Sequence, residues 1–338
     1  MKKLIILFII CFTLLLSGCE KLSLSTKNQS SDEPVSDTQF AFNTFVTITL
    51  YDTTDTSLLE QCFSLCREYE NKFSRTLESS ELWNLNHSTL YQTTLSDDLE
   101  SLLEKGMYYS QLSDGSFDIT IGAVSQLWDF TAESPVLPEE KEIQAHLPFV
   151  NYKTISIENH QLIKENTNTV IDLGAIAKGY IADKLKQFLL ENGVKSGMIN
   201  LGGNILCIGE KPDGEPFKIG IQKPFEDRNE TICAVEISDL SVVSSGIYER
   251  YFKANGVLYH HILNPLTGYP VENNLISVTI ISKNSVDGDA LSTLCFSKGL
   301  KNGLELINSL SDTYAVFITD DYELHFSEGF EDHFKIIS

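Results

Sequence analysis

Short segments rich in β-branched and aromatic residues follow one another through the second half of the chain, and this series limits the fold more than any other feature. Segments of this length and composition, separated by turn residues, are typical of β-strands. Stretches with apolar residues at helical spacing lie before, between and after them. This mixed order, with many antiparallel neighbours, predicts an α+β fold of mixed, largely antiparallel sheets with packed helices. The predicted strands include 45–51, 198–201, 205–208, 217–221, 231–237, 241–244, 248–252, 259–263 and 276–281, and the predicted helices are 58–73, 99–112, 122–128, 174–192, 289–296 and 300–310.

The N-terminus predicts export and a lipid anchor. Lys2 and Lys3 precede an uncharged apolar run, residues 4–16, that is too short to span a bilayer comfortably. The following Ser17 and Gly18 lead into Cys19, an arrangement typical of a signal peptide that is cleaved before a lipidated cysteine. A retained transmembrane helix is the less favoured alternative.

The sequence therefore divides into three parts. Residues 1–18 are the predicted signal peptide, and residues 19–38 are the lipidated cysteine and a polar, flexible tether that has too few apolar residues to fold. Residues 39–338 are long enough to form one large domain with a substantial core. The predicted location is the extracytoplasmic face of the cell membrane, to which the lipid alone attaches the protein.

The net charge restricts the ligands. The chain has 25 Lys and Arg residues against 47 Asp and Glu residues, a formal charge of −22. Such a surface repels nucleic acid, so no nucleic-acid partner is expected. An anionic ligand can bind only where a metal ion, a lysine or a helix N-terminus reverses the local field.

The cysteines do not form a disulfide framework. Once Cys11 is removed with the signal peptide and Cys19 carries lipid, an odd and scattered set is left. These residues are best interpreted as small buried apolar side chains. They are Cys62, Cys66, Cys207, Cys233 and Cys295.

A first candidate site lies where a strand passes into a helix, at residues 171–180. Asp172 supplies a carboxylate, Gly174 allows close approach of a ligand to the main chain, and Lys178 lies one turn inside the helix. These are the groups of a nucleotide or phosphate site. In the simpler alternative, Asp172 only caps the helix and Lys178 is a solvated residue of its first turn.

A second candidate site is the segment 287–293. Asp289 and Thr293 are four residues apart and so share one helix face. Their hard oxygen ligands suit Mg²⁺ better than Zn²⁺ or copper. In the alternative, Asp287 and Asp289 only complement the helix dipole and Thr293 bonds to its own helical turn.

Two adjacent histidines form the third candidate. His260 and His261 end a strand and enter a loop that Pro265 and Gly268 make rigid. Neighbouring side chains on a strand point to opposite faces, so at most one histidine is expected to serve a given site as a proton acceptor. In the alternative, either one is a structural histidine whose hydrogen bonds are satisfied. The segment 200–204, by contrast, is typical of a hairpin turn.

Taken together, these segments resemble the ApbE family, the FAD:protein FMN transferases, in both order and approximate spacing. The resemblance covers the whole mature domain, and other segments extend it. They are 73–75, 85–86, 113–118 with Gly122 and Trp128, 219–224 and 244–252.

The resemblance implies a T-fold-related single catalytic unit and a specific reaction. In this reaction FMN is transferred, with Mg²⁺, from FAD to a threonine or serine hydroxyl of an exported acceptor protein, and AMP is released. Exported flavoproteins of electron-transfer systems are the acceptors that the resemblance suggests. Two alternatives remain open: water replaces the hydroxyl, which makes the chain a Mg²⁺-dependent FAD pyrophosphatase, or the chain is a non-catalytic flavin- or solute-binding lipoprotein.

The resemblance also implies roles for particular residues. His261 is the expected general base. Mg²⁺ is expected to bind the main-chain oxygen of Ala175 and the side chains of Asp289, Ser292 and Thr293. Contacts with FAD are expected from Phe42, Asn86, Gly115, Ser116, Phe117, Asp118, Asp172, Lys178, Arg250, His260 and Leu263.

Three positions depart from the family pattern. Phe42 begins a Phe-Asn-Thr segment where the family commonly has Met-Gly-Thr. Asn264 replaces a common aspartate, and Ile247 replaces a common polar residue. None of them removes a predicted metal ligand or the predicted base, so activity is expected.

Overall fold

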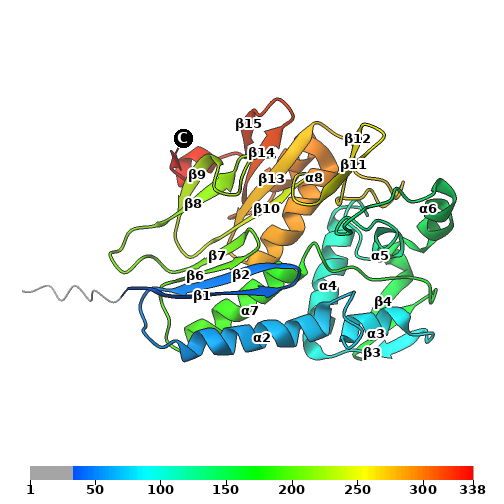
Figure 1. Cartoon of the computed structure of the whole chain (residues 1–338), viewed down its shortest axis with the longest axis horizontal. Helices are drawn as coiled ribbons and strands as arrows, with labels where there is room; N and C mark the ends of the chain where they lie inside the picture. The colour runs from blue at the N-terminus through cyan, green and yellow to red at the C-terminus, as the bar shows by residue number, and fades with distance from the viewer. Residues whose placement is uncertain (1–32, 338) are drawn as a thin grey trace, which may run out of the picture. The chain divides into compact units, whose positions relative to one another are not determined.

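The centre of the molecule is an eight-stranded sheet, and the computed structural model describes residues 33–337 around it (Figure 1). Every neighbouring pair in this sheet is antiparallel, which confirms the predicted α+β class. The predicted signal peptide and Cys19 lie outside the described residues. In spatial order the strands are β1 (Val35–Ala41), β2 (Thr44–Leu50), β6 (Gly197–Leu201), β7 (Asn204–Ile208), β10 (Ser241–Gly246), β13 (Leu275–Ser282), β14 (Tyr314–Thr319) and β15 (Leu324–Phe326).

The domain begins earlier than residue 39. β1 starts at Val35 and pairs with β2 from Val35 opposite Leu50 onward, so the sheet includes residues 35–38, which the sequence assigned to the tether. The hydroxyls of Thr38 and Thr47 lie 2.9 Å apart across the two strands. Because this edge strand is mostly polar, composition alone does not distinguish it from a flexible segment.

Helices cover one face of the large sheet. α7 (Ala177–Glu191) packs on β6 and β7, and α8 (Ser285–Asn308) packs on β10 and β13. Two further helices, α2 (Ser57–Phe73) and α4 (Asp97–Leu112), pack against α7 and α8. α8 changes direction at Gly299, whose backbone is non-helical, so it corresponds to the two predicted helices 289–296 and 300–310.

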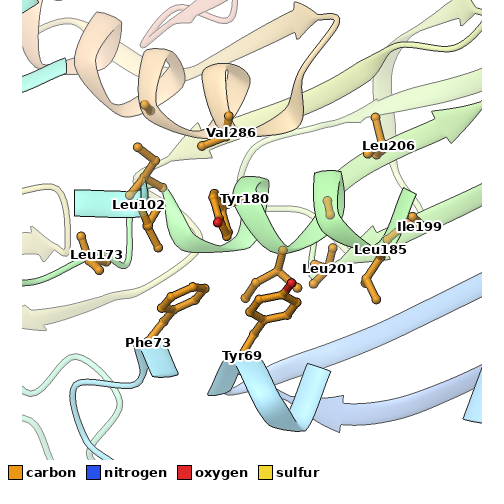
Figure 2. Close-up of a cluster of buried hydrophobic side chains, with 14 of the residues drawn as sticks. Tyr69, Phe73, Leu102, Leu173, Tyr180, Leu185, Ile199, Leu201, Leu206 and Val286 are labelled. Carbon is orange, nitrogen blue, oxygen red and sulfur yellow. The ribbon is translucent and has the colours of Figure 1, made fainter. Parts of the chain in front are cut away.

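α7 is the centre of this helical layer. Figure 2 shows Tyr180 of α7 between Tyr69 and Phe73 of α2 on one side and Val286 of α8 on the other. The Tyr180 ring lies edge-on to Phe73, with ring centroids 5.6 Å apart. Packing on both sides fixes the position of α7, whose N-terminus carries Lys178.

A second, smaller sheet covers the opposite face. It has the order β16 (Ile336–Ile337), β9 (Thr231–Ile237) and β8 (Phe217–Gln222). Its apolar side chains form a separate core with residues of β10, β13 and β14, which explains why β13 is buried along its whole length. The short helix α9 (Phe330–His333) adds Phe330 to this core.

The remaining elements complete the domain. They are α3 (Glu81–His87), α5 (Gly122–Ser125), α6 (Glu140–His146), the 3₁₀ turns Leu147–Phe149 and Tyr152–Thr154, the three-stranded sheet β3 (Gln92–Thr94), β5 (Gln161–Lys164) and β4 (Ile155–Glu158), and the hairpin β11 (Tyr251–Ala254) and β12 (Val257–His260). This hairpin replaces the predicted strands 248–252 and 259–263, because residues 247–250 form a turn that follows β10.

Two smaller predictions are confirmed. Gly202 and Gly203 both have positive φ angles in the tight turn between β6 and β7. The cysteines at 62, 66, 207, 233 and 295 are buried free thiols. Among residues 33–337, no helix combines the length and the apolar character needed to cross a membrane.

Candidate active site

The N-terminal ends of α7 and α8 cross in contact with each other. A Cβ atom added to Gly179 of α7 would lie 2.3 Å from the main-chain oxygen of Ser285, so only glycine permits this approach. Each helix also supplies a carboxylate to the other. Asp183 of α7 accepts hydrogen bonds from the main-chain N–H groups of Ser285 and Val286, and Asp289 of α8 accepts one from Gly179 N–H. The crossing therefore brings together the helix that carries Lys178 and the helix that carries Asp289, as the metal ligands implied by the family resemblance require.

Asp289 is buried, with 3% of its surface exposed, and it faces a cation. Its Oδ1 lies 3.4 Å from Lys178 Nζ, and its Oδ2 accepts the Gly179 N–H hydrogen bond at 2.9 Å. In a regular helix Gly179 N–H would donate to Ala175 O instead. Within residues 33–337 the Ala175 oxygen accepts no hydrogen bond, so its lone pairs stay available.

Hydroxyl groups extend this set of oxygens. Ser245 Oγ, at the end of β10, lies 2.7 Å from Ser292 Oγ and 3.1 Å from Thr293 Oγ1. Ser292 Oγ also donates to the main-chain oxygen of Asp289. Thr293 therefore does not bond to its own helical turn through its hydroxyl, contrary to the alternative considered from the sequence. The hydroxyls of Ser245, Ser292 and Thr293 therefore form one group of hard oxygen donors, and Asp289 lies one helical turn before Thr293 in α8.

Asp172 is not the cap of α7. Its Oδ1 accepts the N–H of Gly174, and its Oδ2 accepts the Ser125 hydroxyl at 2.7 Å and lies 3.3 Å from Arg75 Nε. Burial raises the pKa of Asp172, but Arg75, Ser125 and the Gly174 N–H outweigh burial and hold that pKa below its ordinary value. Asp172 is therefore an ionised residue that fixes the loop before α7.

The two histidines have different environments. His260 is 6% exposed, and both of its ring nitrogens are engaged by the main chain. Its Nε2 lies 3.1 Å from Val271 O, and its Nδ1 accepts the N–H of Ile262 at 3.3 Å. Burial lowers the pKa of His260 to about 4. These contacts give His260 a structural role and do not favour the prediction that it contacts the cofactor.

His261 keeps one nitrogen free. Its Nδ1 lies 3.3 Å from Arg250 O, and because a carbonyl oxygen only accepts, Nδ1 carries the hydrogen. Nε2 is then unprotonated, and within the part of the chain that the structure describes it has no hydrogen-bond partner. Burial, together with the charges of Arg250 and Lys178, lowers the pKa of His261 to about 3. The structure therefore holds a neutral imidazole whose Nε2 lone pair is not used by any other described residue.

Other predicted residues lie in the segments next to this centre. Asn86 is buried and bonds to both the N–H and the oxygen of Ile171, so it holds the chain just before Asp172. Asp118 is buried and accepts hydrogen bonds from Thr120 and from Tyr152 N–H. Direct contacts of these two side chains with FAD stay predictions.

The remaining predicted contacts lie in turns and a rigid loop. Gly115 has a positive φ angle in the turn after α4, and Ser116 and Phe117 follow it in that turn. Phe42 lies in the turn between β1 and β2, and Leu263 is a buried residue of the loop after β12. Their contacts with FAD also stay predictions.

Comparison with known proteins identifies the family. The ApbE family model matches residues 42–318. A curated FAD:protein FMN transferase from Klebsiella pneumoniae is 34% identical over 273 residues, which is 80% of this chain and 84% of the relative. The chain belongs to the ApbE family. A second FAD:protein FMN transferase, from Treponema pallidum, is 30% identical and covers 82% of each chain.

Solved ApbE structures have the same fold. The ApbE protein of Thermotoga maritima superposes with a TM-score of 0.81 at 30% identity, over 88% of this chain and 98% of that one. The flavin transferase ApbE of Vibrio cholerae gives a TM-score of 0.80 at 26% identity, over 89% and 99%.

Some contributors to this ApbE site had no individual role in the sequence prediction. Arg75 and Ser125 both contact Asp172, and Ser245 joins Ser292 to Thr293. Arg75 and Ser245 lie in segments that resemble the family, but those segments alone do not indicate what their side chains touch. Each contact joins residues at least 47 positions apart, so only the fold reveals it.

Proposed function

We propose that this chain transfers FMN from FAD to a threonine or serine hydroxyl of an exported acceptor protein and releases AMP. The observation that supports this proposal most is His261, a neutral imidazole with a free Nε2 that lies within the field of Lys178 and Arg250. The relatives from Klebsiella pneumoniae and Treponema pallidum carry the name of this activity.

The residues at the helix crossing fit a Mg²⁺ ion. The Ala175 oxygen without a donor, the Asp289 carboxylate and the hydroxyls of Ser292 and Thr293 are all hard ligands of the kind Mg²⁺ prefers. When bound, the ion supplies positive charge against the diphosphate of FAD and against the charge that develops on the departing phosphate.

Protein groups perform the remaining tasks. Lys178 and Arg250 attract the diphosphate in a protein whose overall charge of −22 would repel it. His261 Nε2 takes the proton from the acceptor hydroxyl. The hydroxyl oxygen then bonds to the phosphorus on the FMN side, and the bond from this phosphorus to the bridging oxygen breaks. AMP leaves with that oxygen and the electron pair, and the product is a phosphoester-linked flavin.

Substrate binding should make His261 a better base. The two nearby cations disfavour the protonated imidazole in the free enzyme. The negative charges of the FAD diphosphate offset these cations, so the pKa of His261 rises toward the working pH, where general-base catalysis is most efficient.

One assay tests the proposal against its alternatives. The full chain is incubated with FAD, Mg²⁺ and a candidate exported flavoprotein, and flavin fluorescence on a denaturing gel is measured together with AMP. A fluorescent acceptor with AMP is expected. AMP alone would indicate a pyrophosphatase, and neither product would indicate a binding protein.

Two variants test the assigned roles in that assay. Asp289→Asn should lose Mg²⁺-dependent transfer. His261→Ala should keep FAD binding but slow transfer by about 10²–10⁴-fold. A variant of His260 that retains the fold but loses more activity than His261→Ala would show that the base has been assigned to the wrong histidine.

We also propose that the protein is anchored by lipid to the extracytoplasmic face of the cell membrane. The support is the sequence before and at Cys19. Cys19→Ser should leave the chain unlabelled when cells are fed radioactive palmitate, and an equally labelled variant would contradict the anchor.

A further inference from the structure

A strained aromatic residue lies at the surface near the hairpin that holds His261. Phe225, in the loop between β8 and β9, has a φ angle of 62°, a left-handed conformation that is rare for a bulky side chain and costs about 1–2 kcal/mol. Yet 42% of its surface is exposed, so core packing does not repay this cost. Strain of this kind persists most often where a residue has a functional task.

Phe225 belongs to an aromatic cluster next to the hairpin that precedes the base. Its ring lies 5.6 Å from Tyr251, which is 40% exposed, and 6.0 Å from Tyr248. Tyr251 is paired with His260 across the β11–β12 hairpin, and the preceding residue, Arg250, holds His261 through its main-chain oxygen. The aromatic cluster therefore adjoins the main chain that holds the proposed proton acceptor, although strand pairing places the Tyr251 ring on the His260 face of the hairpin.

The same loop reaches the charged side of the site. Burial raises the pKa of Glu249, whereas Arg228 of this loop, Lys178 and Arg250 lower it. Arg228 and Lys178 both lie close enough to Glu249 to act on its carboxylate, so the loop between β8 and β9 lies near the N-terminus of α7.

From this continuity we infer that Phe225 and Tyr251 form the docking surface for the acceptor polypeptide. This inference rests on the proposed transfer reaction. The acceptor hydroxyl must contact His261 Nε2, so the segment that carries it must cross the adjoining surface. Two exposed aromatic rings suit an extended segment with an apolar side chain beside the modified residue. Apolar contacts of this kind do not depend on the overall charge of the partner. The net charge of −22 on the enzyme would by itself attract only a cationic partner.

Phe225→Gly separates docking from folding. Glycine adopts positive φ without strain, so the variant should keep its resistance to urea while it loses the exposed ring. Tyr322→Gly is the matched control, since Tyr322 has a φ angle of 65° and is 41% exposed, in the turn between β14 and β15. Tyr251→Ala tests the second ring.

The experiment measures the initial rate of flavin incorporation against the concentration of an exported flavoprotein that the wild-type full chain modifies, together with the Kd for FAD. Phe225→Gly and Tyr251→Ala should each raise the acceptor KM about tenfold, with an unchanged Kd for FAD and unchanged AMP release in the absence of acceptor. Tyr322→Gly should match the wild type. An unchanged acceptor KM in the Phe225 variant, or an equal rise in the Tyr322 variant, overturns the docking surface but not the transfer reaction. A wild-type chain that modifies no acceptor overturns both.

Discussion

Gly179→Ala tests the helix crossing on which the site depends. Helix propensity alone predicts that alanine stabilises a helix interior by about 1 kcal/mol relative to glycine. At this position, however, the new Cβ would lie 2.3 Å from Ser285 O and 2.6 Å from Val286 Cα, both of which are main-chain atoms. An ordinary contact needs about 3.5 Å, so α7 and α8 must separate by about 1 Å.

This separation has two consequences. Overpacking should lower the free energy of unfolding by about 1–3 kcal/mol, which reverses the effect expected from helix propensity. It should also pull Asp289 away from Gly179 N–H and Lys178, and a displacement of about 1 Å near reacting groups can cost about 10²-fold in rate.

Urea unfolding and the flavin-incorporation assay measure the two effects of Gly179→Ala separately. Gly303→Ala is the control, because its Cβ would lie 2.7 Å from the Phe317 ring in the second half of α8, beyond the change in direction at Gly299. It should lose comparable stability but keep its activity at temperatures where it is folded. The reasoning is refuted if Gly179→Ala transfers flavin at the wild-type rate, or if Gly303→Ala loses as much activity.

Three further substitutions have effects that follow from the structure. His260 has a pKa of about 4 in the folded protein and about 6.5 in the unfolded chain, so between these pH values only the unfolded state binds the proton. Acidification through this window should therefore lower the free energy of unfolding by about 3 kcal/mol. His260→Gln should reduce that loss, as measured by urea unfolding at pH 4.5 and 7. Lys164 is 2% exposed, and burial lowers its pKa below that of the unfolded chain. The free energy of unfolding should therefore rise with pH up to about 10.4, by at most about 1.4 kcal/mol per pH unit, and Lys164→Met should abolish this dependence. Gly193 has a φ angle of 85° with open space around its Cβ position, so Gly193→Ala should cost about 1 kcal/mol in thermal unfolding through backbone strain alone, without loss of transfer.

Local patterns predicted part of the arrangement at this site. The four-residue spacing of Asp289 and Thr293 places both in neighbouring turns of α8, and the Thr293 hydroxyl lies with those of Ser292 and Ser245. Strand alternation predicted that only one of His260 and His261 could serve the site, and the hydrogen bonds agree.

Contacts between distant segments could not be predicted. The sequence allowed Asp172 as a cap of α7, in the alternative to a ligand role, but the Gly179 N–H bonds to Asp289, which lies 110 residues away. The family resemblance implied His261 as the base, but the contact of Val271 O with His260, which leaves His261 as the histidine with a free nitrogen, could not be predicted. β1 was missed for a different reason, because its polar residues gain their order only from pairing with β2.

Because α7 and α8 each provide a carboxylate that accepts hydrogen bonds from the N-terminus of the other helix, the substitution that tests the metal site must keep those hydrogen bonds. Asp289 is a cap for α7 as well as a proposed ligand, and Asp289→Ala would leave the Gly179 N–H without an acceptor and the half-buried Lys178 ammonium without its counter-ion. A buried polar group left without its partner costs about 1–3 kcal/mol, so a loss of activity in the alanine variant would not distinguish a lost ligand from a displaced helix. Asp289→Asn keeps an oxygen for Gly179 and removes only the charge. If the carboxylate binds Mg²⁺, the asparagine variant should unfold near the wild-type urea concentration and still fail to respond to Mg²⁺. If its function is only to hold α7 against α8, the same variant should keep a Mg²⁺-dependent rate close to that of the wild type.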